Sequence, residues 1–114
     1  MYWVRYHIRH LRRWRQAAKA VAEAVKTLGL KARVYVIGGA AEDRLTVLSD
    51  VDVLVCLDRE DEPTPAERRQ LKHAIIDGAI DRHGLPWDYP LDLHIHGARE
   101  CRRILEKTKA VLVG

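Results

Sequence analysis

The sequence has few cysteines and no long apolar stretch, and both absences narrow the class of protein. Its only cysteines, Cys56 and Cys101, are too few for the disulfide framework of a small secreted domain, and they predict reduced thiols in a cytoplasmic protein. No run approaches the roughly 18 apolar residues of a membrane span, so we expect no membrane insertion. Residues 1–10 contain neither the apolar segment nor the cleavage site of an export signal, which also predicts a cytoplasmic location.

Asparagine is absent and glutamine is rare, whereas arginine is abundant. This composition is typical of proteins from thermophiles and predicts such a source. At 114 residues the chain is long enough for a single modest core, so we expect one domain that spans residues 1–114. Charged residues make up 32% of the chain and apolar residues 47%, a balance typical of globular domains.

The net charge of +4 is unevenly distributed along the chain. Arginines crowd the first fifteen residues, whereas residues 58–62 are mostly acidic. A basic N-terminal helix of this kind can contact nucleic acid, an acidic partner or the phosphates of a substrate, and it can equally be an ordinary solvated face. The sequence leaves these alternatives open.

Apolar spacing and capping residues predict three helices. In residues 5–28 the apolar positions recur at steps of three and four, and Gly29 follows as a left-handed cap. In residues 64–67, Thr-Pro-Ala-Glu combines a capping hydroxyl, a proline at the first helical position and a glutamate three residues after the cap. That helix is expected to end near Gly84, and a last helix is expected over residues 98–107.

Four largely apolar segments predict strands: residues 32–37, the run 50–57 that opens with Asp50 and Asp52, residues 91–96, and an edge strand at 110–113. The order is therefore helix, strand, strand, helix, strand, helix, with a short strand at the end. This order indicates an α+β fold, a small mixed β-sheet with helices packed on one face. We expect the other face to be uncovered.

Two glycines end the first strand, and two aspartates begin the second. The missing side chains of Gly38 and Gly39 let a ligand phosphate approach the backbone N–H groups. Asp50 and Asp52 are separated by one apolar residue, so side-chain alternation directs both carboxylates to one face and the valines of the strand to the other. Two acids on one face of a strand make half of a divalent-metal site.

Asp92 is a candidate third member of this site. It lies between Leu91 and Leu93 in an apolar run, so its carboxylate points to the face opposite both. If this strand pairs beside the strand of Asp52, at about 4.8 Å, the three carboxylates converge. Without a cation they would repel one another strongly, which is the physical case for a metal.

The combination of two glycines at a strand end, Asp50-x-Asp52 and a later isolated Asp92 resembles the DNA polymerase β-like nucleotidyltransferase superfamily. More narrowly, the chain looks like a minimal nucleotidyltransferase, a small prokaryotic catalytic domain of the kind encoded beside a helical HEPN-type partner. The resemblance covers roughly residues 32–97. It implies a polymerase β palm-like fold.

The resemblance also implies Mg²⁺-dependent transfer of a nucleoside monophosphate, AMP where ATP is the donor, to an acceptor hydroxyl. Asp50, Asp52 and Asp92 would form a two-metal site, and Asp92 would in addition activate the acceptor. The nucleotide would be bound by Gly38, Gly39, Arg44 and Ser49. By the same resemblance, the acceptor would be a tyrosine of a HEPN-type toxin, and the chain would be its antitoxin. Apart from the resemblance, a homodimer is a further possibility, with the aromatic N-terminal segment as the expected contact.

The glycine turn departs from the family pattern at three positions. Family members commonly carry a serine where Gly39 stands and an Arg-Gly pair where Glu42 and Asp43 stand. A hydroxyl and a cation for the triphosphate are therefore missing, and Arg44 is the residue placed to supply the cation. This departure supports a second hypothesis, a catalytically degenerate nucleotidyltransferase fold that sequesters a partner.

A third hypothesis rests on two histidines. His94 and His96 share the face of Asp92, and a His-x-His pair on a strand can ligate Zn²⁺ or another transition metal in a hydrolase. Alternatively, both histidines line the cleft near substrate phosphate. Trp87 and Tyr89 precede the same strand and are expected either to pack over a helix end or to stack on a base.

Overall fold

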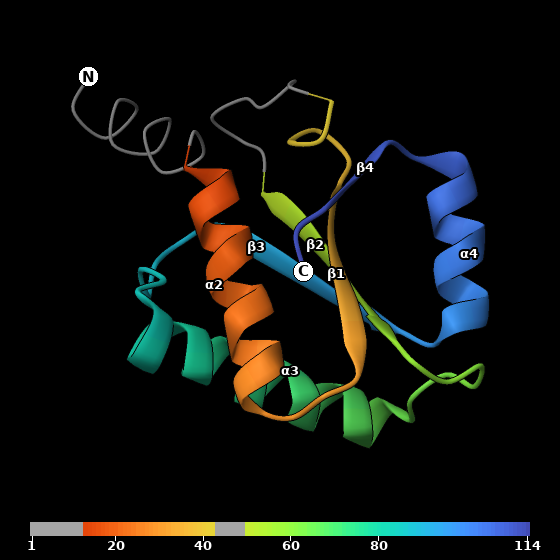
Figure 1. Ribbon diagram of the computed structural model, residues 1–114, viewed down its shortest axis with the longest axis horizontal. Coiled ribbons are helices and arrows are strands. Elements are labelled where there is room, and N and C mark those ends of the chain that lie inside the picture. Colours follow the sequence, from red (N-terminus) through yellow and green to blue (C-terminus); the bar gives the residue numbers. More distant parts are fainter. Residues whose placement is uncertain (1–12, 43–49) are drawn as a thin grey trace.

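A computed structural model of the chain describes residues 13–42 and 50–114. This part of the chain contains three helices and four strands (Figure 1). In chain order they are α2 (Trp14–Thr27), β1 (Ala32–Ile37), β2 (Val51–Leu57), α3 (Pro65–His83), β3 (Leu91–His96), α4 (Ala98–Lys107) and β4 (Ala110–Leu112). The predicted α+β class and the predicted order of elements are confirmed.

The four strands form one mixed sheet in the order β3-β2-β1-β4. β1 pairs antiparallel with β2 on one side and with β4 on the other, whereas β2 and β3 run parallel. The prediction that the two aspartate-bearing strands lie side by side is confirmed by this pairing. The short C-terminal strand is at the edge of the sheet, as expected.

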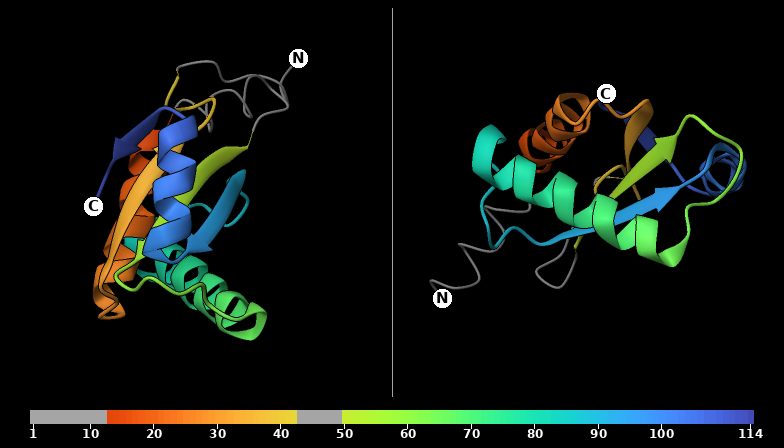
Figure 2. Two further views of the ribbon diagram at one scale, coloured as in Figure 1. Left: turned by 90° about the vertical axis from the view of Figure 1, so that its right-hand side faces the viewer. Right: turned by 90° about the horizontal axis from the view of Figure 1, so that it is seen from below.

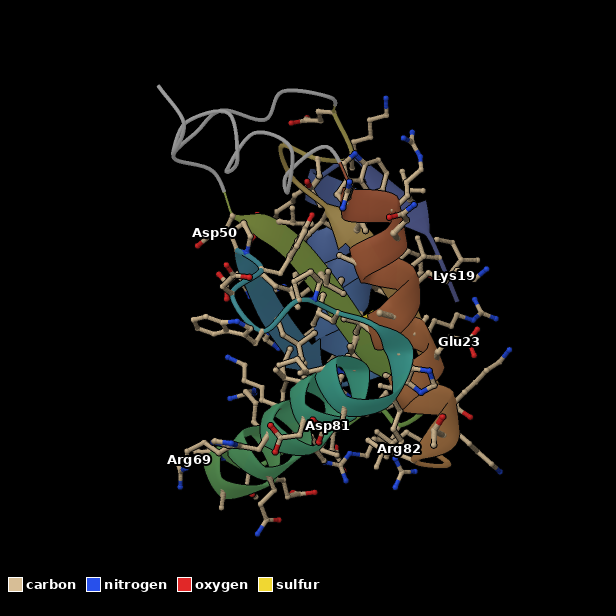
Figure 3. The ribbon with its side chains drawn as sticks, turned by 90° about the vertical axis from the view of Figure 1, so that its left-hand side faces the viewer. Lys19, Glu23, Asp50, Arg69, Asp81 and Arg82 are labelled. Atoms are coloured by element: carbon tan, nitrogen blue, oxygen red, sulfur yellow. A yellow bond between two sulfur atoms is a disulfide. The ribbon has the colours of Figure 1, made fainter. Side chains whose placement is uncertain are left out.

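α2 and α3 pack together against the face that carries the valines of β2 (Figure 2). Val51, Val53 and Val55 are fully buried there, together with Val21 of α2 and Ile75 of α3. The outer surfaces of both helices carry charged side chains (Figure 3). Burial of this face is the main source of stability, because each buried aliphatic side chain contributes about 1.5–3 kcal/mol relative to its exposed state.

α4 differs from the expectation that helices cover one face only, because it lies across the opposite face of the sheet (Figure 2). On that face Leu54 is fully buried and Cys56 is bonded to Cys101 of α4. Cys101 is the buried residue of α4, while Ile104 and Leu105 are half-buried. The helix therefore covers the C-terminal end of β2 and leaves the end that carries Asp52 open.

The prediction of reduced thiols is wrong, because Cys56 and Cys101 form a disulfide with their Cα atoms 5.9 Å apart. The two residues are 45 positions apart in the sequence and meet only because α4 returns over the sheet. Disulfides occur in secreted proteins and also in intracellular proteins of hyperthermophiles. The bond by itself therefore assigns no cellular compartment. Cytoplasmic location and a thermophilic source stay predictions.

Among the described helices, none combines the length and the apolar character needed to cross a membrane.

The helix ends follow the predicted capping signals. The Thr64 hydroxyl accepts a hydrogen bond from the Glu67 backbone N–H, and the Glu67 carboxylate accepts one from the Thr64 N–H, both at 3.1 Å. Gly84 ends α3 at a φ of 78°, and Gly29 follows α2 at a φ of 72°, a region that disfavours any residue with a Cβ. Residues 5–12 of the predicted first helix lie outside the described part of the chain.

Candidate functional site

Asp52 and Asp92 lie side by side on the open end of the sheet. The parallel register of β2 and β3 pairs Asp52 directly with Asp92. Both point to the face opposite the buried valines, and their side chains are 35% and 50% exposed. Two like charges on adjacent strands repel each other, so this pairing needs a positive partner.

His94 supplies a nitrogen to the same cluster. Its Nε2 atom is 3.2 Å from Asp52 Oδ1 and 3.4 Å from Asp92 Oδ2. One ligand atom from each of the three residues lies within 4.8 Å of the other two. The sequence placed His94 in the cleft, but it did not predict that the ring would lie between the two carboxylates.

Gly38 lies beside Asp52, on the side of the cluster away from Asp92. It directly follows β1, whose last residue Ile37 pairs with Asp52, and it adopts a φ of 71°. A Cβ at this position would lie 3.0 Å from Asp52 Oδ2, so a residue with a side chain would displace the carboxylate by a few tenths of an ångström. The Glu42 N–H donates to the Gly38 carbonyl at 3.1 Å and closes a turn from Gly38 to Glu42. The glycine turn and the carboxylates thus form one site.

Of the other predicted site residues, Asp50 and Gly39 lie in the described part of the chain. Asp50 is exposed and lies immediately before β2, at the beginning of the strand (Figure 3). It does not join the group in which Asp52, Asp92 and His94 approach within 4.8 Å. Gly39 is half-buried in the turn beside Gly38. Arg44 and Ser49, predicted to bind nucleotide, lie outside the described residues, as does Asp43 of the family departure.

His96 has a different role from His94, although both side chains leave the same face of β3. Its Nδ1 atom is 2.6 Å from Glu62 Oε1. The other oxygen of Glu62 accepts a hydrogen bond from the Gly97 N–H, and Arg68 lies 3.6 Å from Glu62. His94 and His96 therefore do not converge on a common metal position, which removes the geometric basis of the predicted His-x-His site.

The acidic segment 58–62 is fastened to the helices by ion pairs. Arg102 of α4 contacts both carboxylate oxygens of Glu60, at 3.1 and 2.8 Å, and Arg59 lies 3.0 Å from Glu67 of α3. The hydrogen bond from Arg102 lowers the pKa of Glu60 below its usual value. Partial desolvation raises the pKa of Glu62, but Gly97, His96 and Arg68 outweigh it, and the net pKa is lowered. Glu60 and Glu62 therefore connect segment 58–62 to its neighbours and are not part of the cluster of Asp52, Asp92 and His94.

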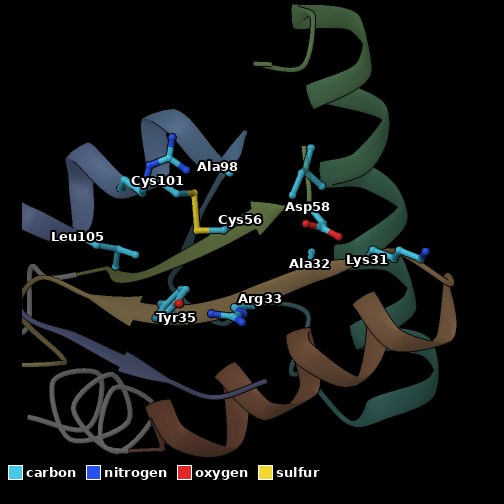
Figure 4. Close-up of a pocket in the computed structure, with 11 residues that line it drawn as sticks. Lys31, Ala32, Arg33, Tyr35, Cys56, Asp58, Ala98, Cys101 and Leu105 are labelled. Carbon is cyan, nitrogen blue, oxygen red and sulfur yellow. A yellow bond between two sulfur atoms is a disulfide. The ribbon is translucent and has the colours of Figure 1, made fainter. Parts of the chain in front are cut away.

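A pocket of about 530 Å³ lies on the same face of the sheet, at the other end of β2 (Figure 4). Its lining includes the Cys56–Cys101 disulfide, Tyr35, Arg33 and Leu105 of α4. Tyr35 and Arg33 pair across the sheet with Leu54 and Cys56, so they share the face of Asp52. The pocket does not include the carboxylates, and the sequence did not predict it because that face was expected to be uncovered.

Trp87 and Tyr89 have separate environments. Tyr89 is buried with 9% exposure, and burial raises the pKa of its phenol. Trp87 is 82% exposed, so the expectation that it packs over a helix end is wrong. Its stacking on a base stays a prediction.

Comparisons with known proteins bear on the family and the fold of the chain. A family model described as a nucleotidyltransferase domain matches residues 18–111. The chain is also similar to the crystal structure of a candidate nucleotidyltransferase from Sulfolobus solfataricus, with a TM-score of 0.65 and 21% sequence identity. That similarity covers 93% of this chain and 84% of the other, and it supports the fold. A comparison with curated proteins finds no match.

Proposed function

The chain belongs to the nucleotidyltransferase domain family, and we propose from this that it transfers AMP from ATP to an acceptor hydroxyl at Asp52 and Asp92. The observation that carries the proposal is the direct pairing of Asp52 with Asp92 beside Gly38. A glycine turn beside Asp52 brings a phosphate-binding backbone and a cation-binding group within one small area.

The described residues fit a divalent cation such as Mg²⁺. Asp52 and Asp92 offer carboxylate oxygens on one open face, the ligand type that Mg²⁺ prefers. Gly38 keeps a side chain out of the space beside Asp52. When bound, the cation would neutralise the triphosphate and the charge that develops on the leaving pyrophosphate. Asp50 is the predicted third ligand and would complete a two-metal arrangement only by turning toward this pair.

In the proposed reaction the acceptor oxygen attacks the α-phosphorus of ATP. A bond forms between the acceptor oxygen and that phosphorus as the bond to the bridging oxygen breaks, and pyrophosphate leaves. The proton of the acceptor hydroxyl passes to the carboxylate of Asp92, which is half-exposed and open to an incoming acceptor. The backbone N–H groups that follow Gly38 orient the triphosphate. Arg44 is proposed to replace the cation that the family pattern places in this turn.

We further propose that the acceptor belongs to a partner protein. Asp92 is 50% exposed, so the cluster lies on an open surface and not at the bottom of a closed cleft. A second chain is therefore needed to exclude water and to complete the binding site. The family resemblance makes a tyrosine of a helical HEPN-type toxin the first acceptor to test, with this chain as its antitoxin.

The test is transfer of label from α-labelled ATP to a candidate partner in the presence of Mg²⁺. We expect labelled partner with the wild-type chain and at least a hundredfold less with Asp92→Asn. Asp81→Asn is the control, because Asp81 is an exposed carboxylate on α3 and lies outside the cluster. Equal labelling with wild type and Asp92→Asn would refute the proposal.

One observation favours the second hypothesis, a module that sequesters its partner without chemistry. Asp50 does not join the group of Asp52, Asp92 and His94, so fewer carboxylates converge than a two-metal site uses. A chain that binds its partner tightly but binds no ATP, by calorimetry with the partner present, would support this hypothesis. Binding of ATP that is lost in Asp52→Asn would exclude it.

A further inference from the structure

We infer that His94 is a direct ligand of the cation at Asp52 and Asp92, so that the site prefers Mn²⁺ to Mg²⁺. The inference rests on the cation site of the proposed function and concerns which ion that site selects. The resemblance predicts three carboxylates and no imidazole, whereas the described residues bring together two carboxylates and one imidazole. The nitrogen therefore changes the chemical character of the site.

The distances from His94 to the two carboxylates match those between ligands of one ion, and all three ligand atoms lie within 4.8 Å of one another. Ligand atoms about 2.1 Å from a metal are about 3.0 Å apart at an octahedral angle and about 3.4 Å apart at a tetrahedral angle. The His94 Nε2 atom is 3.2 Å from Asp52 Oδ1 and 3.4 Å from Asp92 Oδ2. The three side chains therefore need little movement to share one cation.

The backbone holds His94 in this position. His94 pairs with Leu54 in the parallel register, and both residues lie two positions beyond the paired aspartates. Its neighbours on β3, Leu93 and Ile95, are buried in the core on the opposite face. Since the core fixes this strand, the imidazole can reach the carboxylates by rotation of its own two side-chain angles alone. A ligand that is placed in advance loses little conformational entropy on binding.

The donor set determines the preferred ion. Mg²⁺ binds oxygen ligands and retains water, whereas imidazole nitrogen favours transition metals. Mn²⁺ accepts carboxylate oxygens and is softer than Mg²⁺, so it can use all three side chains. We therefore expect the imidazole to strengthen the binding of Mn²⁺ more than the binding of Mg²⁺.

His96 provides a matched control on the same strand and the same face. It lies two residues from His94, and Glu62 holds its ring at 2.6 Å. His96→Ala removes an imidazole of the same kind and leaves the carboxylate cluster complete. A difference between His94→Ala and His96→Ala therefore reports the position of the ring and not the loss of a histidine.

The experiment titrates the full chain with Mn²⁺, followed by electron paramagnetic resonance, with Mg²⁺ as competitor and no nucleotide present. We expect His94→Ala to weaken Mn²⁺ binding about tenfold or more and to weaken Mg²⁺ binding much less. His96→Ala should bind Mn²⁺ as the wild type does. Unchanged or tighter Mn²⁺ binding in His94→Ala would overturn the inference.

A spectroscopic measurement keeps the test independent of how well the variants fold. An imidazole bound to Mn²⁺ gives a nitrogen coupling in the electron spin echo spectrum, and the wild type should display it. The coupling should persist in His96→Ala and disappear in His94→Ala. A wild-type spectrum with bound Mn²⁺ and no nitrogen coupling would overturn the inference.

Failure of the metal-ligand inference can be distinguished from failure of the proposed function. Mn²⁺ binding with a nitrogen coupling from His94, in a chain that transfers no nucleotide, supports the metal site and refutes the transfer. Transfer of nucleotide with no loss of Mn²⁺ affinity in His94→Ala refutes the metal ligand and leaves the transfer intact.

Discussion

Asp52 on β2 and Asp92 on β3 are direct partners in the parallel register of the sheet. Adjacent strands lie about 4.8 Å apart, so two carboxylates on one face at this register are held close by the backbone itself. Because both strands direct these side chains to the same face, the two carboxylates cannot move far apart while the strands stay paired. A charge arrangement that costs free energy and is built into the backbone is a mark of a functional site.

Replacement of Asp92 by asparagine should abolish function and leave the fold intact. The side chain is 50% exposed, lies 3.4 Å from His94 and is not part of the hydrophobic core, so the substitution removes a charge from the cluster and no side chain from the core. We expect the rate of nucleotide transfer to fall by about a hundredfold to ten-thousandfold, the usual contribution of a general base. The measurement is the initial rate with α-labelled ATP, and an unchanged circular dichroism spectrum is the control. A rate within threefold of wild type would exclude Asp92 as the base.

Replacement of Gly38 by alanine should impair both stability and cation binding. The left-handed φ of 71° costs roughly 1–2 kcal/mol for a residue with a Cβ. The added Cβ would in addition lie 3.0 Å from Asp52 Oδ2 and move the carboxylate. We expect a lower free energy of unfolding in urea and weaker Mn²⁺ binding.

Gly29→Ala is the control for this substitution. Gly29 has a similar φ of 72°, but its Cβ would meet no atom within 4 Å. It should lose a comparable free energy of unfolding and keep the cation affinity of the wild type. If both alanine variants bind Mn²⁺ equally well, Gly38 does not shape the site.

Reduction of the disulfide should lower thermal stability. Cys56 and Cys101 close a loop of 45 residues, and a link of this length contributes about 2–4 kcal/mol by restricting the unfolded chain. For a chain of this size, we expect the Tm to fall by on the order of 10 °C in a strong reductant. Scanning calorimetry with and without dithiothreitol measures the change. The double variant Cys56→Ala, Cys101→Ala should not respond to reductant, and a wild-type Tm that reductant leaves unchanged would contradict the prediction.

Stability should fall in acid through the ion pairs of segment 58–62. Gly97, His96 and Arg68 lower the pKa of Glu62 in the folded state below the ordinary value of 4.5, despite its partial desolvation. Because the folded pKa is the lower one, the stabilisation is fully present above about pH 4.5 and is lost as the pH falls through the folded pKa. Urea unfolding across this range should give a steeper loss for the wild type than for Glu62→Gln. Parallel curves for the two proteins would assign the acid response to other groups.

The sheet and the carboxylate pair could be predicted because strand alternation is a strong local signal. Asp52 and Asp92 each interrupt an apolar run, which sets the face of the side chain, and the order of the elements favours pairing of their strands. Asp50 was assigned to the same face by the same alternation. In the structure it precedes β2, where the alternation of a paired strand no longer applies.

The remaining features depend on contacts between distant segments. The half-buried Ile104 and Leu105 indicate an apolar side of α4, but they do not say which face of the sheet the helix covers. Cys101 reaches Cys56 only because α4 covers the face of the sheet that carries Cys56. Since the sequence did not predict that face, it did not predict the disulfide. His94 and His96 have the same alternation, and only the conformation of segment 58–62 brings Glu62 to His96 and leaves His94 to the carboxylates.

The most direct test of the account is the position of a bound cation in a crystal of the chain grown with Mn²⁺, measured by anomalous scattering at the manganese edge. We predict a peak about 2–2.3 Å from a carboxylate oxygen of both Asp52 and Asp92. A peak that contacts only one of them, or a peak at Glu62 and His96 with none between the two aspartates, would contradict it.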